Sequence, residues 1–148
     1  GRREPRDAHV AYDRPLRLAE HLRREQEVID KIKAVWKCDV KKLPIAYRLD
    51  YVLLQDNKPV AVMEIKCRNA MYEEMHLSLH KCMAGKEMSK SVGLPFILVY
   101  EFKDKGIYWH KIEDGPLELA IGGRTDRGDW QDIEPMAVFR LSTFRMLK

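Results

Sequence analysis

Apolar residues between Leu16 and Trp36 recur at steps of three, four or seven, which is the spacing of one face of a helix. The members of this stripe are Leu18, Leu22, Ile29, Ile32 and Trp36. Pro15 precedes the stripe, and proline suits the first position of a helix because its missing N–H is not needed there. We therefore expect an irregular segment over residues 1–14, followed by an amphipathic helix.

Two further patterns predict a hairpin and a second helix. Residues 45–54 and 60–67 are rich in Val, Ile, Leu and Tyr, and the stretch QDNKP between them is typical of a turn. A helical pattern then extends from about Ala70 to Val92, with Gly93 as its expected C-cap.

The rest of the chain predicts a second hairpin and a last strand. FILVYEF, residues 96–102, is almost continuously apolar, as expected for a central strand, and DKG turns it into the strand IYWHKI. A further strand is expected around residues 136–141. The order helix–hairpin–helix–hairpin–strand predicts a mixed α/β fold, and 148 residues are expected to form a single domain over 1–148.

The composition indicates what class of protein this is, but it says little about its function. Hydrophobic residues make up 45% and charged residues 34%, a balance typical of folded chains. No run approaches the roughly 20 apolar residues that span a bilayer, and the N-terminal stretch lacks the apolar core of a secretory signal. The three cysteines, Cys38, Cys67 and Cys82, include no CxxC pair, which favours a reducing cytoplasm over a disulfide framework or zinc site.

The charge of the chain permits a polyanionic partner without establishing one. The net charge is +4, from 27 Lys and Arg against 23 Asp and Glu. Five lysines lie between Lys31 and Lys42, and the loop GGRTDRGD carries Arg124 and Arg127. A solvated basic face and a track for phosphate groups explain these clusters equally well.

Three charged residues interrupt the first predicted hairpin. Asp50 opens one apolar run, and Glu64 and Lys66 close the other. Because side chains alternate along a strand, Glu64 and Lys66 share a face. A hairpin folded about Asn57 also sets Asp50 opposite Glu64, with Cβ atoms about 5 Å apart. The register decides this, because a shift of one residue would move Asp50 to the other face.

Two adjacent carboxylates repel each other unless a cation lies between them. Oxygen ligands favour Mg²⁺ or Mn²⁺ over zinc, which prefers His and Cys. A Glu–Lys pair alone is common on exposed strands, but the aspartate in cross-strand register makes a functional site the better explanation. We therefore expect Mg or Mn at this patch.

Asp50, followed after thirteen residues by Glu64, Ile65 and Lys66, resembles the motif of the PD-(D/E)XK nuclease superfamily. The predicted order of elements over residues 16–102 resembles the restriction-endonuclease-like core of that family, and the chain looks like its small phage-type members. Leu49 stands where the motif has proline, a position that varies in the family.

The resemblance implies an enzyme that hydrolyses DNA phosphodiester bonds, in the host cytoplasm if the protein is phage-encoded. It implies that Asp50, Glu64 and the main-chain carbonyl of Ile65 bind the metal. Lys66 would orient or deprotonate the attacking water and stabilise charge on the phosphate.

A third acid is expected on the first helix. Glu25 occupies a position of the apolar stripe, whereas Glu20 and Glu27 fall off it. If the helix packs over the hairpin, it delivers Glu25 to the metal patch, where it would hold a metal-bound water or help to bind a second ion; the alternative is a glutamate at the rim of the core or paired with a buried arginine. Members of the family often carry a glutamate on this helix, and the resemblance supports the catalytic role for Glu25.

Several basic residues are candidates for contacts with nucleic acid. Lys81 interrupts the apolar row of the second predicted helix, so it either covers the edge of the core or points to the active site. His76 and His80 are four residues apart on that helix, but without an HExxH signature they are expected to approach phosphate rather than to share a metal. The expected contact residues are Arg68, Lys81, His80, Arg124 and Arg127.

No GxSxG elbow or GxxxxGK[ST] loop offers a competing catalytic centre. Alternatives are a nucleic-acid-binding module of the same fold without catalysis, a structural protein whose acids pair with lysines, and a nuclease that acts on RNA. Among DNA nucleases, a junction resolvase, an exonuclease and a nicking endonuclease remain open, as does a homo-oligomer.

Overall fold

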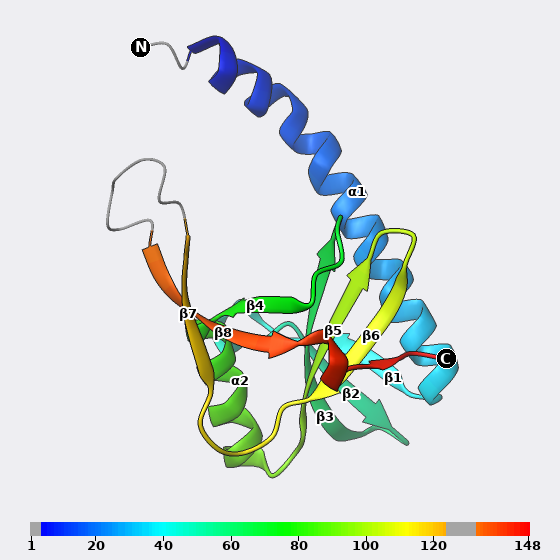
Figure 1. The fold of residues 1–148 in the computed structure, drawn as a ribbon. Coiled ribbons are helices and arrows are strands. Elements are labelled where there is room, and N and C mark those ends of the chain that lie inside the picture. The colour runs from blue at the N-terminus through cyan, green and yellow to red at the C-terminus, as the bar shows by residue number, and fades with distance from the viewer. Residues whose placement is uncertain (1–3, 124–132) are drawn as a thin grey trace.

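The computed structural model describes residues 4–123 and 133–148, which form a long helix, a six-stranded sheet and a third layer with a shorter helix and a three-stranded sheet (Figure 1). The predicted mixed α/β class is confirmed. The helices are α1 (Glu4–Trp36) and α2 (Leu79–Val92). The large sheet has the order β1 (Asp39–Lys42), β2 (Tyr51–Gln55), β3 (Lys58–Arg68), β5 (Phe96–Phe102), β6 (Gly106–Lys111) and β9 (Arg145–Met146). The small sheet has the order β4 (Glu74–Ser78), β8 (Ile133–Arg140) and β7 (Glu118–Gly123).

The central pair of the large sheet, β3 and β5, is parallel, and its other neighbouring strands are antiparallel. Parallel strands require a crossover connection, and here the chain passes through β4 and α2 between them. Over the described residues, neither helix is long and apolar enough to cross a membrane.

Helix α1 covers one face of the large sheet with only its C-terminal half. Val28, Ile29 and Ile32 are buried against the sheet, whereas Leu18 and Leu22 are 56% and 52% exposed. The reason is visible in Figure 1, where the N-terminal half of the helix extends beyond the strands. The apolar stripe in the sequence therefore identifies the face of α1 that packs on the sheet. It overestimates the length of helix that is in contact with the sheet.

The expected irregular segment over residues 1–14 is wrong from Glu4 onward, because α1 begins there and passes through Pro15. Proline inside a helix removes one backbone hydrogen bond and costs about 3 kcal/mol. The helix continues through Pro15 in spite of this cost.

The turn between β2 and β3 consists of two residues, whereas the sequence predicts a turn centred on Asn57. Asp56 and Asn57 both have left-handed φ angles, 49° and 63°, as a type I′ turn requires. A two-residue turn alone would set Asp50 opposite Met63. The expected register is restored by a β-bulge.

At the bulge, Leu54 pairs with Pro59 but Leu53 pairs with Ala61, so Val60 is the extra residue. Beyond it Tyr51 pairs with Met63, and one further step sets Asp50 opposite Glu64. Because of the bulge, Val60 packs on the α1 side of the sheet together with Ala61 instead of sharing the face of Glu64.

The second helix is shorter than expected, because residues 74–78 form strand β4 and α2 begins only at Leu79. Gly93 is confirmed as its C-cap, with a φ of 69° and an N–H that donates to the carbonyl of Ser89. Gly85 lets the ring of Phe96 pack directly on the helix, since a Cβ there would lie 2.1 Å from that ring. The strand expected around residues 136–141 is β8, but it belongs to the small sheet rather than to the large one.

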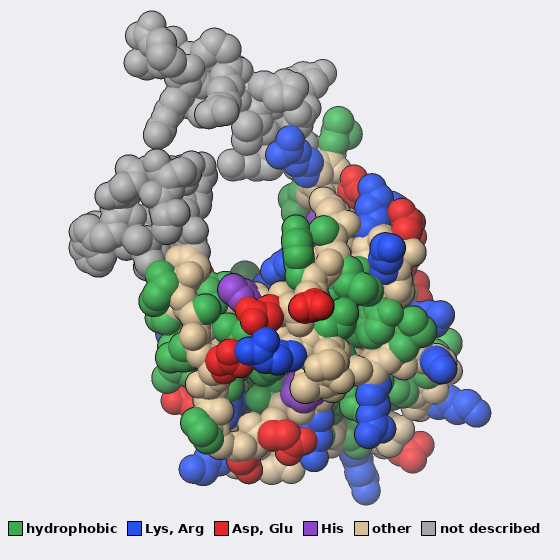
Figure 2. Space-filling model, viewed as in Figure 1, with side chains coloured by type: hydrophobic (Ala, Val, Ile, Leu, Met, Phe, Trp, Pro, Cys, Tyr) green, Lys and Arg blue, Asp and Glu red, His purple; other side chains and the backbone are tan. Residues whose placement is uncertain are grey.

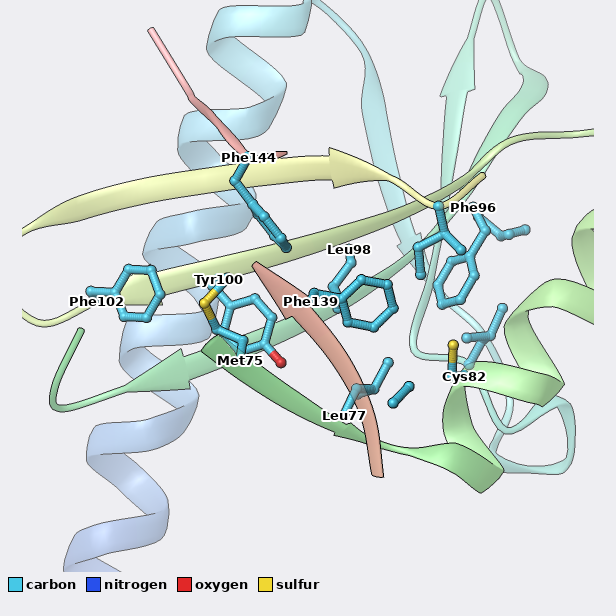
Figure 3. Packing of buried hydrophobic residues seen from close by; sticks show 13 residues of the cluster. Met75, Leu77, Cys82, Phe96, Leu98, Tyr100, Phe102, Phe139 and Phe144 are labelled. Atoms are coloured by element: carbon cyan, nitrogen blue, oxygen red, sulfur yellow. The ribbon is translucent and has the colours of Figure 1, made fainter. Parts of the chain in front are cut away.

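Two hydrophobic cores lie on opposite faces of the large sheet. The core on the α1 side contains Ile32, Tyr51, Met63 and Val99, among others. The other core lies between the large sheet and the third layer, as Figure 3 shows. Its labelled members are Met75, Leu77, Cys82, Phe96, Leu98, Tyr100, Phe102, Phe139 and Phe144. Glu64 and Lys66 of β3 share the face of Val62, so they lie at the edge of this second core.

Candidate active site

Asp50 and Glu64 lie side by side at the β2 and β3 strands, as the register requires. Glu64 is the one buried charged residue among those described, with 0% of its side chain exposed. Asp50 directly precedes β2 and is about one-third exposed. The site therefore reaches from the edge of the core to the protein surface.

Two lysines face these carboxylates. The Nζ atom of Lys81, from the first turn of α2, lies 2.9 Å from Oε1 of Glu64 and 3.3 Å from Oδ1 of Asp50. Nζ of Lys66 lies 3.7 Å from the same Oε1 atom. Of the two alternatives for Lys81, the structure shows the side chain that points at the acidic pair, where its ammonium bridges the two carboxylates.

The hydrogen-bonding capacity of the Glu64 carboxylate is not fully used in this position. The ammonium of Lys81 is its nearest donor, and neither carboxylate oxygen of Glu64 accepts a well-aligned hydrogen bond among the described residues. Burial raises the pKa of Glu64 to about 7; the charge of Asp50 acts in the same direction, and contacts with Lys81 and Lys66 oppose it. Partial burial lowers the pKa of Lys81, but Glu64 and Asp50 outweigh this and raise it overall, which keeps the ammonium charged.

The acidic pair fits a hard divalent cation. A buried carboxylate beside a second carboxylate on the same face offers the oxygen ligands that Mg²⁺ and Mn²⁺ prefer. Within the described ranges, no three Asp, Glu, His or Cys side chains gather around one point. Asp50 and Glu64 are the two side chains of this site that could hold such an ion.

Glu25 contacts Tyr51 and His21 in the structure. Its carboxylate accepts a hydrogen bond from the hydroxyl of Tyr51 and lies 3.5 Å from Nε2 of His21. The Tyr51 side chain packs in the core on the α1 side, where burial, and then the hydrogen bond to Glu25, raise its pKa. The structure therefore joins Glu25 to the residue that follows Asp50, without grouping it with the two acids. Glu27 is exposed and pairs with Arg23, as its helix phase predicts.

The candidate contacts with nucleic acid are dispersed. Arg68 ends β3, with its guanidinium 5.9 Å from the centre of the Tyr100 ring. His80 is exposed on the first turn of α2, while His76 lies on β4, so the expected shared helix face does not exist. Arg124 and Arg127 lie outside the described residues.

One polar network near the site has no signal in the sequence. The guanidinium of Arg24 on α1 donates to Oε1 of Glu101 at 2.5 and 3.0 Å and to Oδ1 of Asn69 at 2.7 Å. It also donates to the carbonyl of Arg68. This network ties α1 to the ends of β3 and β5, and its partners are too far apart in sequence for any local pattern to reveal them.

A mixed sheet whose two central strands are parallel, with Asp50 directly before β2 and Glu64 and Lys66 on β3, defines a restriction-endonuclease-like α/β fold of the PD-(D/E)XK class. The model of the family described as "Phage putative PDDEXK endonuclease" matches residues 17–147, and the chain belongs to this family. The resemblance recognised in the sequence is thereby confirmed.

Comparison with solved structures supports the fold. Eight chains match, among them Hjc, a Holliday junction resolvase from Archaeoglobus fulgidus. The TM-score is 0.51 at 14% sequence identity, and the match covers 77% of this chain and 88% of the resolvase. At this identity the likeness shows a shared fold alone. A search of curated proteins found no match.

Proposed function

We propose that this protein is a nuclease that hydrolyses phosphodiester bonds of DNA with the help of Mg²⁺ or Mn²⁺. The observation that carries the proposal is Glu64, a fully buried carboxylate that accepts no well-aligned hydrogen bond and lies beside Asp50 and two lysines. Burying a charge in this way is costly unless the group is used. Membership of an endonuclease family supports the same conclusion.

Each residue of the site has a distinct task in this proposal. Asp50, Glu64 and the main-chain carbonyl of Ile65 would hold the metal, and a bound metal would supply positive charge for the phosphate and Lewis acidity for the attacking water. Lys66 orients the attacking water through its ammonium group, whose charge stabilises the extra negative charge that the phosphate acquires in the transition state. Lys81 compensates the two carboxylates while no metal is bound.

Glu25 is proposed to act through Tyr51. Its hydrogen bond anchors the tyrosine that follows Asp50 in the chain, which holds the start of β2 in place. Glu25 is then a positioning residue, and the cleavage rate depends on it although it does not bind the metal directly.

The pairing of both acids with Lys81 is also what a purely structural role would produce. The two roles differ in their response to metal: a structural ion pair predicts no effect of Mg²⁺ on stability, whereas a metal site predicts stabilisation. A binding module without catalysis would bind DNA and leave it intact.

The test is incubation of the purified protein with linear duplex, circular, single-stranded and four-way-junction DNA, and with RNA, in Mn²⁺ or in EDTA. The junction is included because the similarly folded Archaeoglobus protein is a Holliday junction resolvase. We expect cleavage of at least one DNA substrate in Mn²⁺ and none in EDTA. Absence of cleavage by folded protein on every substrate, with Mg²⁺ as well as with Mn²⁺, would contradict the proposal.

A further inference from the structure

A hollow of about 440 Å³ lies between strand β4 and the C-terminal ends of β3 and β5. It is on the third-layer face of the large sheet, because Tyr100 and Phe102 belong to the core on that side. This face also carries the proposed catalytic lysine, since Lys66 pairs with Tyr100 in the register of β3 and β5. The lining residues are Arg68, Ala70, Tyr72, Glu74, Met75, His76, Tyr100 and Phe102.

The floor of the hollow is apolar and aromatic. Met75, Tyr100 and Phe102 lie together at one end of the core (Figure 3), and the centres of the two stacked rings are 5.8 Å apart. The hydroxyl of Tyr100 donates to the main-chain carbonyl of His76, so the polar atom of this ring is used inside the protein. A phosphate group or a metal ion would find few polar partners on such a floor.

Two side chains with planar groups form the rim of the hollow. The guanidinium of Arg68 lies over the Tyr100 ring, 5.9 Å from its centre, and donates to the carbonyl of Cys67. The Arg68 side chain is exposed above that ring. Tyr72, in the segment that joins β3 to β4, is 66% exposed. Aromatic rings and guanidinium planes are the surfaces on which nucleobases stack.

The charges around the hollow suit an anionic strand. Glu74 is the one carboxylate among the described lining residues, and Arg140 neutralises it at a distance of 2.8 Å. Figure 2 shows acidic and basic side chains side by side over the small sheet, where Arg140 also pairs with Glu118. Arg68, by contrast, forms no ion pair with a carboxylate in the described part of the chain. The side of the hollow that lies on β3 therefore keeps a positive charge.

The hollow adjoins the residues proposed to act on the phosphate. Arg68 follows Lys66 by two residues on β3, which corresponds to about 7 Å along the strand. A nucleotide next to the phosphate that is cleaved is therefore within reach of the hollow, whose volume exceeds that of a single base.

We infer that this hollow takes an unpaired base of the substrate, from a nucleotide next to the phosphate that is cleaved. Tyr72 and the guanidinium of Arg68 hold the base by stacking, which tolerates any base because each has a flat face. This inference rests on the proposed nuclease function.

The inference also defines the class of DNA that the protein prefers. In a continuous duplex the bases are stacked inside, and stacking on one side chain does not exceed the cost of extracting a base. The preferred substrates are therefore single strands and DNA with unpaired bases at the cut, such as flaps, gaps and branch points.

The test compares three variants at exposed tyrosines. Tyr72→Ala removes the ring, and Tyr72→Phe keeps the ring without its hydroxyl. The matched control is Tyr47→Ala, because Tyr47 is 53% exposed and lies outside the hollow. Binding of a fluorescent single strand and of the continuous duplex of the same sequence is measured by anisotropy in EDTA at several salt concentrations. Thermal melting of each variant checks that the fold is intact.

For Tyr72→Ala we expect single-strand binding to weaken at least about fivefold, the smallest effect typical of one stacking ring. Its duplex binding should stay within about twofold of the wild type, and its salt slope should be unchanged because no phosphate contact is lost. Tyr72→Phe and Tyr47→Ala should bind both DNAs as the wild type does. Unchanged single-strand binding by Tyr72→Ala, equal losses on both DNAs, or an equal loss in Tyr72→Phe or Tyr47→Ala would overturn the inference.

The position of the base is tested on whichever DNA the wild type cleaves. After the cut is mapped, the base on one side of it, and then the base on the other, is replaced by an abasic nucleotide that keeps the phosphate. One replacement should slow the wild type at least about fivefold and should affect Tyr72→Ala less than about twofold. If neither replacement slows the wild type, or if both proteins are slowed equally, the base does not lie where we place it.

These outcomes separate the inference from the proposed function. If the wild type cleaves DNA and Tyr72→Ala binds single strands as the wild type does, the base site is wrong and the nuclease proposal stands. If single-strand binding depends on Tyr72 but the wild type cleaves no substrate, the nuclease proposal fails and the hollow is a base site of a binding protein. If the wild type binds no DNA, both fail.

Discussion

The buried carboxylate of Glu64 predicts an unusual dependence of stability on pH. An unfolded glutamate has a pKa near 4.5, whereas burial raises the pKa of Glu64 in the folded protein to about 7. Between these two pH values the folded state binds more protons than the unfolded state. The free energy of unfolding therefore falls as the pH rises from about 4.5 to about 7, which is opposite to the usual behaviour of a salt-bridged acid.

The size of this effect follows from the pKa displacement. Each pKa unit corresponds to 1.36 kcal/mol, so the change from 4.5 to about 7 amounts to about 3 kcal/mol. The Glu64 side chain is fully buried, and solvent screening does not reduce the figure.

The assay is urea denaturation between pH 4 and about pH 8 in EDTA, for the wild type and for Glu64→Gln, which keeps the shape of the side chain but does not titrate. Ionisable groups that do not interact with Glu64 cancel in the difference between the two proteins. The variant should gain about 3 kcal/mol relative to the wild type across this range. The exposed Glu27→Gln variant is the control, and its curve should parallel that of the wild type. A difference between Glu64→Gln and wild type that is the same at every pH would refute the reasoning.

Four further predictions concern the other residues of the site. Mg²⁺ or Mn²⁺ should raise the melting temperature of the wild type, and Asp50→Asn should lose most of this shift; an unchanged response would remove Asp50 from the ligands. Lys66→Ala should slow cleavage at least about 100-fold while its metal-induced shift in melting temperature persists, and a wild-type rate would disprove its role. Lys81→Met should lower the metal-free free energy of unfolding by about 1–3 kcal/mol, since it leaves Glu64 without its nearest cation, and should bind Mg²⁺ more tightly in calorimetry; weaker Mg²⁺ binding would argue against compensation by Lys81. Glu25→Gln should lower cleavage strongly, whereas Glu27→Gln should cleave as the wild type does; the reverse result would mean that the assigned helix face is wrong.

The sequence was sufficient to predict the fold class and the acidic pair, because both depend on local patterns. Alternation along β3 sets Glu64 and Lys66 on one face, and apolar runs identify the central strands. The register that brings Asp50 to Glu64 was predicted correctly from an incorrect turn. The two-residue turn and the bulge at Val60 compensate each other, and only the structure reveals either of them.

The remaining differences arise from tertiary structure. Residues 74–78 alternate polar and apolar side chains, as a strand does, but this short stretch runs directly into the helical pattern of α2. Its pairing with β8, far along the chain, shows that it is a separate strand. The stripe on α1 predicted that Glu25 faces inward, yet could not predict that Tyr51 would be its partner. The contact of Lys81 with both carboxylates depends on where α2 packs against β3, and the Arg24 network depends on long-range contacts in the same way.

The central claim is that the Asp50–Glu64 pair supports metal-dependent cleavage of DNA. Its most direct test is the single-turnover cleavage rate in Mn²⁺ of the wild type and of Glu64→Gln, on whichever DNA substrate the wild type cleaves. We expect Glu64→Gln to be slower by at least about 1,000-fold, because it removes a ligand of the ion that stabilises the transition state. If Glu64→Gln cleaves at the wild-type rate, the buried carboxylate has no part in catalysis and this account of the site is wrong.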